Sequence, residues 1–205
     1  SADLDPLSLI ERVLPVYAEV LTTLASEGAD WVQIDEPILG TDLNDAQRDA
    51  FRKAYATLSK CGLKIVVATY FERLDDNLSL VAALPIDGLH IDLVRAPEQL
   101  ASVLSVWPKS RTLSLGVIDG RNIWRADLDA AFSLVEKAIA ARGPDSLQIA
   151  PSCSLLHAPV DLDRETKLED ELKSWLALSK QKLAELAALT HAANNGKQAA
   201  AEAFT

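Results

Sequence analysis

The sequence predicts an α/β fold made of parallel βα units of the TIM-barrel type. Five short apolar runs alternate with stretches of helical periodicity, so the expected order is one helix followed by five strand–helix units. Each apolar run ends in polar or charged residues. These lie at the carboxyl end of the expected strand, where a (βα)8 barrel has its functional site. A barrel needs eight strands, and about five are present. We therefore expect an incomplete barrel that lacks its first three βα units unless another chain or segment completes it.

The five strands are read from near-continuous apolar runs bounded by turn residues. They are expected at residues 31–37 (WVQIDEP), 64–71, 89–94, 112–118 and 147–150. No GxGxxG pattern follows the first of them, which argues against a dinucleotide-binding fold.

The first helix is expected over residues 6–27. Asp5 is placed to cap it, Pro6 suits the first helical position, and Gly28 suits the carboxyl end. Its apolar face carries residues at helical spacing: Leu9, Val13, Val16, Val20 and Leu24.

Further helices follow the strands. They are expected at residues 44–60, 75–84, 96–107 and 127–142 and, after a long loop over 151–165, in an alanine- and leucine-rich segment that ends near residue 193. We interpret residues 1–196 as one partial barrel domain and residues 197–205 as a frayed tail.

Composition excludes several classes of protein. The 205 residues carry a net charge of −10, which argues against nucleic-acid binding because phosphate contacts depend on Lys and Arg. Cys61 and Cys153 are too far apart in sequence for a CxxC pair, which favours a reducing cytoplasm. No apolar run approaches transmembrane length, so no membrane contact is expected. The sequence contains no methionine, which indicates a processed chain or a fragment.

Five motifs together carry a family resemblance. WVQIDEP, TYF, LPIDGLHIDLVRAPEQL, LSLGVIDGRNIWRADL and IAPSCSLLHAPVDLDRE resemble cobalamin-independent methionine synthase, over about residues 7–196. The resemblance implies an enzyme of two face-to-face (βα)8 barrels that transfers a methyl group from a folate polyglutamate to homocysteine. This chain is similar to the later part of the amino-terminal barrel.

The resemblance also implies where a zinc site has degenerated. Zinc is expected in the carboxyl-terminal barrel of the whole enzyme, on a His, two Cys and a Glu. At the duplicated positions this chain has Tyr70, Glu72, Asp92 and Cys153, and Asp35 stands where the active barrel contacts the homocysteine amino group. Because this set lacks the soft nitrogen and sulfur ligands that select zinc, we expect no metal, no cofactor and no catalytic residue in this chain.

Other strand-end residues are candidates for ligand or interdomain contacts. The DGRNIW segment places Asp119, Arg121 and Trp124 in a loop, with Arg125 next to it. Arg121 and Arg125 are the expected contacts to an anion, and Trp124 is the expected stacking residue. Asp119 is also expected to form an ion pair with one of these two arginines.

A purely structural interpretation stands beside each of these. Asp35 and Glu36 could accept hydrogen bonds from loop amides or pair with arginine. Asp92 and Arg95 are expected to form an ion pair. His90 is expected to be a packed or hydrogen-bonded core histidine.

Three functions follow from these patterns. The leading hypothesis is a fragment of a methionine synthase that is inactive alone, supports the folate cleft and contacts the carboxyl-terminal barrel and folate polyglutamate. The first alternative is an independent hydrolase that uses strand-end carboxylates such as Glu36 and Asp119. The second is a non-catalytic assembly module that self-associates through its unpaired sheet edges.

Overall fold

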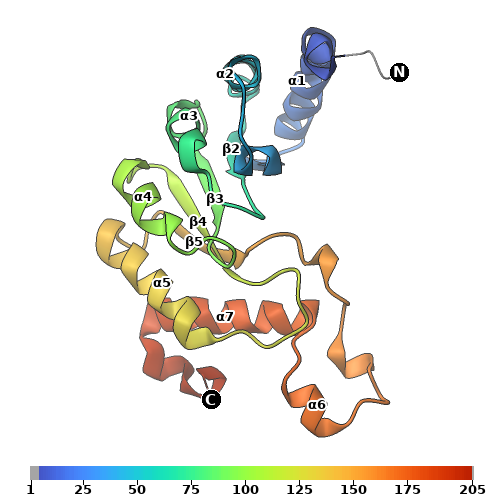
Figure 1. The fold of residues 1–205 in the computed structure, drawn as a ribbon, viewed down its shortest axis with the longest axis vertical. Helices are drawn as coiled ribbons and strands as arrows, with labels where there is room; N and C mark the ends of the chain where they lie inside the picture. The colour runs from blue at the N-terminus through green and yellow to red at the C-terminus, as the bar shows by residue number, and fades with distance from the viewer. Residues whose placement is uncertain (1–4, 205) are drawn as a thin grey trace.

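The computed structural model describes residues 5–204 and contains one parallel sheet with the strand order β1-β2-β3-β4-β5 (Figure 1). The strands are β1 (Trp31–Asp35), β2 (Lys64–Ala68), β3 (Gly88–Asp92), β4 (Thr112–Ile118) and β5 (Leu147–Pro151). Chain order and sheet order coincide, as they do around a (βα)8 barrel, whereas a doubly wound sheet reverses its order. The expected fold class is confirmed, and β1 and β5 form the edges of the sheet.

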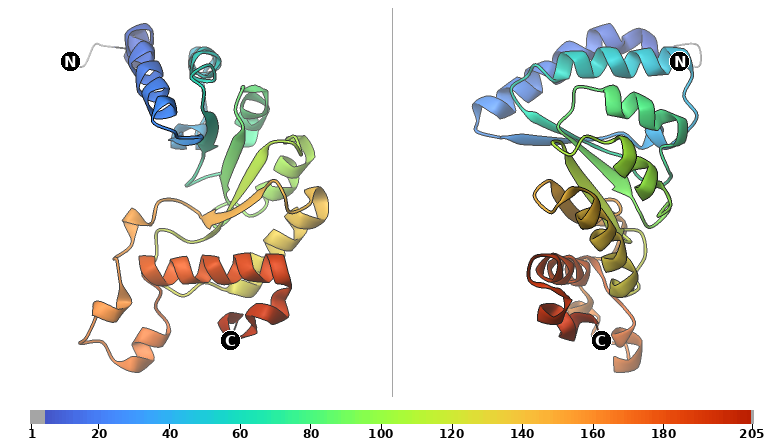
Figure 2. Two further views of the ribbon diagram at one scale, coloured as in Figure 1. Left: turned by 180° about the vertical axis from the view of Figure 1, so that it is seen from behind. Right: turned by 90° about the vertical axis from the view of Figure 1, so that its left-hand side faces the viewer.

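One outer side of the sheet is covered by an arc of helices (Figure 2). These are α1 (Ile10–Ser26), α2 (Asp45–Leu58), α3 (Leu78–Ala83), α4 (Gln99–Val106), α5 (Leu128–Arg142) and α7 (Ser179–Asn195). The shorter helical segments are η1 (Pro6–Leu9), η2 (Pro37–Gly40), η3 (Asp75–Asn77), η4 (Leu155–His157), η5 (Leu162–Arg164), α6 (Asp170–Ser174) and η6 (Lys197–Phe204). None of the helices within residues 5–204 is long and apolar enough to cross a membrane.

The hydrophobic core lies between the sheet and these helices. Side chains alternate along each strand, so one set faces the helices and the other faces the inner side. The helix-facing set is apolar and fully buried and includes Ile65, Val67, Leu89, Ile91, Leu113 and Leu115. On the inner side one register row crosses all five strands and is small or polar: Asp35, Ala68, His90, Ser114 and Gln148. A closed barrel fills this space with layers of large branched side chains, which this register row does not supply.

The helix expected over residues 6–27 is divided into the 3₁₀ segment η1 and the α-helix α1, and it buries a different face from the one expected. The Asp5 carboxylate accepts a hydrogen bond from the Leu7 amide at 3.0 Å, which caps the η1 segment that leads into α1. Leu14 and Leu21 are buried, on the side where α1 packs against α2. The apolar face expected from the sequence is instead exposed, because α1 stands beside the edge strand β1 and the described residues place no further helix beyond it.

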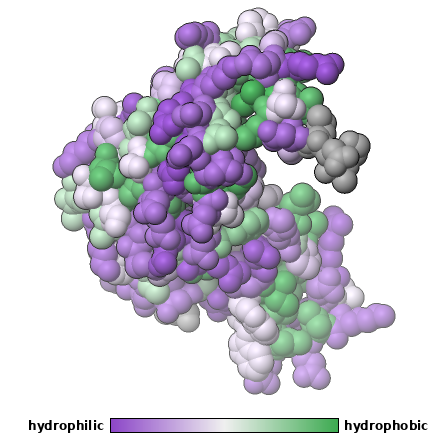
Figure 3. All heavy atoms as spheres, turned by 45° about the horizontal axis from the view of Figure 1, so that its top comes forward, coloured by the Kyte–Doolittle hydropathy of each residue, from purple (hydrophilic) through white to green (hydrophobic). Residues whose placement is uncertain are grey.

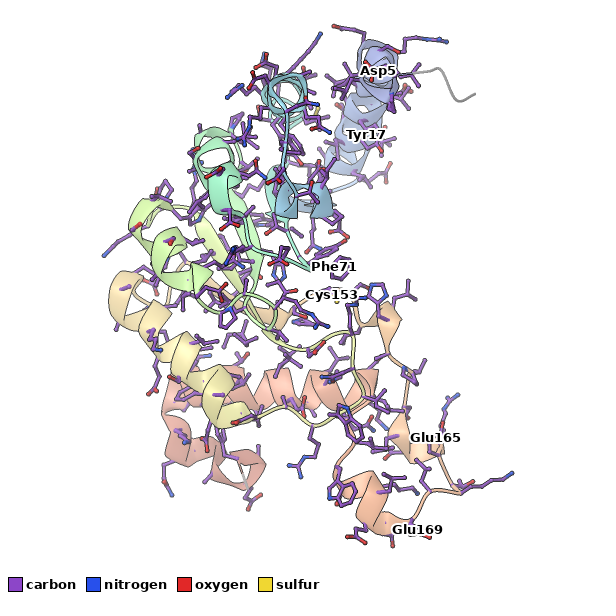
Figure 4. All side chains as sticks on the ribbon, viewed as in Figure 1. Asp5, Tyr17, Phe71, Cys153, Glu165 and Glu169 are labelled. Atoms are coloured by element: carbon purple, nitrogen blue, oxygen red, sulfur yellow. The ribbon has the colours of Figure 1, made fainter. Side chains whose placement is uncertain are left out.

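This exposed face, called the α1 stripe here, consists of five residues that are 41–57% exposed: Val13, Val16, Tyr17, Val20 and Leu24. Tyr17 projects from the outer side of α1 in Figure 4.

The chain between β5 and α7 is less helical than expected. After the short 3₁₀ segments η4 and η5, only the five residues of α6 are α-helical before the chain becomes extended and pairs with the loop after β4. Arg125 N donates to Trp175 O at 2.9 Å, and Ala177 N donates to Ile123 O at 2.8 Å. Because this pairing satisfies the amides outside a helix, the long helix α7 begins only at Ser179.

The last described residues form the 3₁₀ segment η6, where a frayed tail was expected. The ring of Phe204 lies edge-on to that of Phe132 in α5, with centroids 5.8 Å apart, so an aromatic contact holds this end of the chain. The domain boundary at residue 196 stays a prediction.

Candidate functional site

The polar residues predicted from the sequence lie where the strands end. Asp35 and Asp92 are the last residues of β1 and β3, while Tyr70, Asp119 and Cys153 follow β2, β4 and β5. Parallel strands that run side by side end at the same edge of the sheet. These residues therefore gather at one edge, called the mouth here.

Asp35 is held by two side chains, Gln33 of β1 and Tyr70 of the loop after β2. The Tyr70 hydroxyl donates to one carboxylate oxygen at 3.0 Å, and Gln33 Nε2 donates to the other at 2.8 Å. Burial, followed by the nearby carboxylate, raises the pKa of Tyr70 to about 12. Tyr70 is therefore a neutral donor at physiological pH, and it is not the phenolate that would bind a metal.

Asp92 is buried, with 1% of its surface exposed, and accepts three hydrogen bonds from the main chain. Its Oδ2 accepts from Phe71 N at 3.0 Å, and its Oδ1 accepts from Val94 N at 3.0 Å and Arg95 N at 2.9 Å. The predicted ion pair with Arg95 was wrong, because the carboxylate takes the amide of that residue and not its guanidinium. Asp92 thus holds the loops after β2 and β3 in place.

Asp119 has a similar role in the loop after β4. Its Oδ1 accepts from Arg121 N at 2.8 Å and its Oδ2 accepts from Asn122 Nδ2 at 2.9 Å. The predicted ion pair with Arg121 or Arg125 was therefore also wrong. The Arg125 guanidinium donates at 3.4 Å to the main-chain oxygen of Ser174.

Phe71 is a residue of the mouth to which the sequence analysis assigned no role, although it belongs to the TYF motif. Its φ of 79° lies in the left-handed region, which costs a non-glycine residue about 1–3 kcal/mol. The Arg121 guanidinium stands 4.5 Å from the centre of its ring, and the rings of Tyr70 and His157 lie edge-on to it. Figure 4 shows Phe71 next to Cys153, so the loops after β2, β4 and β5 meet at this ring.

Cys153 is buried, and burial raises the pKa of its thiol. The loop after β4 passes directly over it: a Cβ added at Gly120 would lie 2.7 Å from Cys153 O and 3.0 Å from its Sγ. Only glycine permits this close approach.

The four positions of the implied zinc site do not form a metal centre. The Tyr70 hydroxyl and the Asp92 carboxylate are hydrogen bonded as described above, and Glu72 is exposed and accepts from Arg73 N at 3.1 Å. Across residues 5–204 no three His, Cys, Asp or Glu side chains are arranged to hold a metal ion. Cys153 alone supplies a soft donor, so the set does not fit zinc. That the chain binds no metal stays a prediction.

His90 is a hydrogen-bonded core residue, as expected. Its Nδ1 lies 2.9 Å from Ser114 Oγ and its Nε2 lies 3.1 Å from Ser152 O. Burial lowers the pKa of the imidazole, which favours the neutral ring. A Cβ at Gly116 would lie 2.9 Å from His90 Cε1, so the ring leaves no space for a ligand on that side.

Glu36 points away from the mouth, toward α2. Its Oε1 accepts from the Tyr55 hydroxyl at 2.8 Å, and Tyr55 is 1% exposed. Burial raises the pKa of Glu36, and the hydrogen bond from Tyr55 partly offsets this. Glu36 and Asp119 are thus engaged in different parts of the structure, which weakens the hydrolase interpretation.

Exposed apolar side chains gather on the loop after β4 and on the segment between β5 and α7. This distal surface consists of residues that are 36–89% exposed: Ile123, Trp124, Leu156, Val160, Leu172 and Trp175. In Figure 3 apolar groups occupy the part of the molecule that projects at the lower right, where Figure 1 places this segment. Exposed apolar side chains that gather in one region are a feature of surfaces that contact other molecules.

Comparison with known sequences identifies relatives. Residues 1–142 match the family described as "Cobalamin-independent synthase, N-terminal domain". The chain is 55% identical over 205 residues to a 5-methyltetrahydropteroyltriglutamate–homocysteine methyltransferase of Nitrobacter winogradskyi, which covers 99% of this chain and 27% of the relative. It is 54% identical over 192 residues to the Coxiella burnetii protein of the same name, covering 94% and 25%. The chain thus spans about a quarter of the length of these curated relatives.

Comparison with solved structures agrees on the fold. A structure from Listeria monocytogenes, described as a vitamin-B12-independent methionine synthase, superposes with a TM-score of 0.57 at 15% sequence identity. The match covers 91% of this chain and 54% of the other. At this identity the likeness concerns the fold alone, and it agrees with a parallel βα arrangement.

Proposed function

The chain belongs to the family of the cobalamin-independent synthase N-terminal domain, and on that basis we propose that it is a scaffold part of a methionine-forming methyltransferase. The name of its relatives describes methyl transfer from 5-methyltetrahydropteroyltriglutamate to homocysteine. In this proposal the reaction takes place in another barrel, which holds the zinc, and this chain supports the cleft for the folate in the cytoplasm.

The observation that carries the proposal is the engagement of the acidic groups at the mouth. Asp35, Asp92 and Asp119 each accept at least two hydrogen bonds from groups of this same chain. A carboxylate that serves as a ligand or a general base needs a free oxygen directed at the substrate. Carboxylates that hold loops instead give the mouth a fixed shape, which suits a support role.

The distal surface supports a contact between this chain and the catalytic barrel. Trp124 and Trp175 are about half exposed, and their main chains are joined by the pairing that links the loop after β4 to the segment before α7. Aromatic side chains on a fixed backbone are effective contact residues. We assign this surface to contact with the catalytic barrel, and we assign Arg121 and Arg125 to contacts with the anionic glutamates of the folate.

A methyl-transfer assay tests the proposal. The chain is supplied with zinc, homocysteine and 5-methyltetrahydropteroyltriglutamate, and methionine is quantified by mass spectrometry. We expect no methionine above the level of a reaction without protein. Turnover by the chain alone that disappears in Cys153→Ser would overturn the proposal, because it would place the reaction at this mouth.

Self-association is a second candidate property, and the α1 stripe favours it. Five half-exposed apolar residues on one face of a helix are unusual in an isolated domain. Self-association through this stripe is compatible with a scaffold role, because the stripe lies on α1 and the mouth lies at the strand ends.

A further inference from the structure

We propose that Lys182 is the positioning residue of the candidate site: its buried ammonium holds the loop of residues 119–126 so that Arg121 is presented at the mouth and Trp124 on the distal surface. That Lys182 holds the loop is argued from hydrogen bonds alone. That Arg121 and Trp124 then contact a ligand or another domain rests on the proposed function.

Lys182 is a charged residue in an unusual place. It lies in the first turn of α7, is 1% exposed, and donates to two neutral oxygens of one loop, Asn122 Oδ1 and Trp124 O, both at 3.0 Å. Burying an ammonium is unfavourable unless it forms specific hydrogen bonds, and an apolar residue would fill the same space at lower cost. The ammonium is therefore explained by the loop that it binds.

Asn122 connects Lys182 to the strand end. Its Nδ2 donates to Asp119 Oδ2 at 2.9 Å, while its Oδ1 accepts from Trp124 N at 3.1 Å as well as from Lys182. The side-chain amide is thus oriented, with oxygen toward the ammonium and nitrogen toward the carboxylate. A continuous path of hydrogen bonds runs from β4 through the loop to α7.

Glu185 holds the same loop one turn further along α7. Its Oε1 accepts from Ala126 N at 2.9 Å, so Lys182 and Glu185 bind successive parts of the loop from one face of the helix. The loop held by these contacts has an irregular main chain, and its outward side chains include Arg121, over the Phe71 ring, and the half-exposed Trp124. Loosening Lys182 should therefore release both side chains from their present positions.

Hydrogen–deuterium exchange of the 205-residue chain tests the inference with Lys182→Met, which keeps the length of the side chain and removes its donors. We expect exchange in the peptide spanning residues 119–127 to accelerate by about tenfold, with peptides of β2 and β3 unchanged. Lys137→Met is the matched control, because Lys137 is exposed on α5, and it should leave both regions unchanged. An unchanged loop in Lys182→Met, or equal acceleration in loop and strands, would overturn the inference.

Asn122→Ala provides a second variant in case Lys182→Met does not fold. It removes the hydrogen bonds that link Asp119 to Lys182, at a partly buried loop position. Exchange in the peptide spanning residues 119–127 should accelerate, and a wild-type exchange rate there would contradict the inference. Quenching of tryptophan fluorescence by pteroyltriglutamate is measured in parallel. If the wild-type chain shows no quenching, the folate contact of the proposed function fails, while the exchange data still decide the role of Lys182. If the wild-type chain shows quenching, Lys182→Met should weaken the binding of pteroyltriglutamate and Lys137→Met should not.

Discussion

At the mouth, side chains at the positions of the implied zinc site hold loops in place. Asp92 is the clearest case, since one buried carboxylate accepts three main-chain amides from two loops. Charge-assisted hydrogen bonds of this kind are strong, and their donors are left without partners when the acceptor is removed. The acid at this position therefore has a structural reason to be present without a metal.

Asp92→Ala should destabilise the chain strongly. Three amide donors would lose their acceptor at a buried site, which we expect to lower the free energy of unfolding by about 3 kcal/mol. Urea denaturation followed by circular dichroism measures the change. Asp75→Asn is the control, because Asp75 is exposed and pairs with Arg73 on the surface, and it should cost less than about 1 kcal/mol. Similar losses in both variants would contradict the role assigned to Asp92.

The Glu36 carboxyl predicts a pH dependence of stability. Its pKa is raised in the folded state above the ordinary value of 4.5, mainly by burial, so the folded chain retains a proton that the unfolded chain releases. Its contribution to stability is fully present below about pH 4.5 and is lost as pH rises through the folded pKa.

Glu36→Gln should remove this dependence. The amide oxygen can still accept from Tyr55, so the variant should gain stability relative to the wild type between pH 4 and pH 7. Unfolding free energies from urea titrations at the two pH values measure the difference. A stability difference between variant and wild type that does not change with pH would refute the assignment.

At the residue scale the sequence predicted the positions of the mouth residues but not their bonds. Asp35, Asp92 and Asp119 lie at strand ends as expected, because strand ends follow from the apolar runs. Their partners are main-chain amides and a neighbouring tyrosine, which depend on how loops fold back. Phe71 and Lys182 were assigned no role because their importance comes from distant contacts. Phe71 contacts Arg121, 50 positions away, and Lys182 contacts Asn122, 60 positions away.

Among the elements, the strands followed the sequence most closely and the segment before α7 least. Near-continuous apolar runs identify buried strands in any α/β sheet, whereas the late start of α7 depends on pairing between the main chains of Arg125 and Trp175. The apolar face of α1 was also correctly identified as a pattern. Its exposure was not predictable, because periodicity shows that a face is apolar and not what covers it.

The α1 stripe predicts self-association of the chain at micromolar concentration. Replacing Val16 and Val20 by Lys removes two half-exposed apolar side chains, each worth about 1 kcal/mol if buried on association, so the dissociation constant should rise at least about tenfold. Sedimentation velocity over a concentration series measures it. Glu19→Lys, on an exposed position of the same helix, controls for added positive charge. A wild-type chain that stays monomeric would contradict this prediction.

Residues 5–204 form a curved part of a barrel with five parallel strands, hydrogen-bonded carboxylates at the mouth, and exposed apolar side chains on α1 and on the distal surface. The sequence predicted this architecture because each βα unit is locally encoded and the units join in chain order. What each open surface contacts was not predictable from the sequence, since contacts with further protein leave no local pattern. The inner face carries the small and polar register row that crosses all five strands.

The central claim is that the mouth is a support and not a reaction centre, and zinc binding tests it most directly. The chain is incubated with a twofold excess of zinc, passed through a desalting column and measured by atomic emission. We predict substantially less than one zinc per chain, with the same value for wild type and Cys153→Ser, because Tyr70 and Asp92 are engaged by Asp35 and by main-chain amides. One zinc per chain that is lost in Cys153→Ser would contradict the claim.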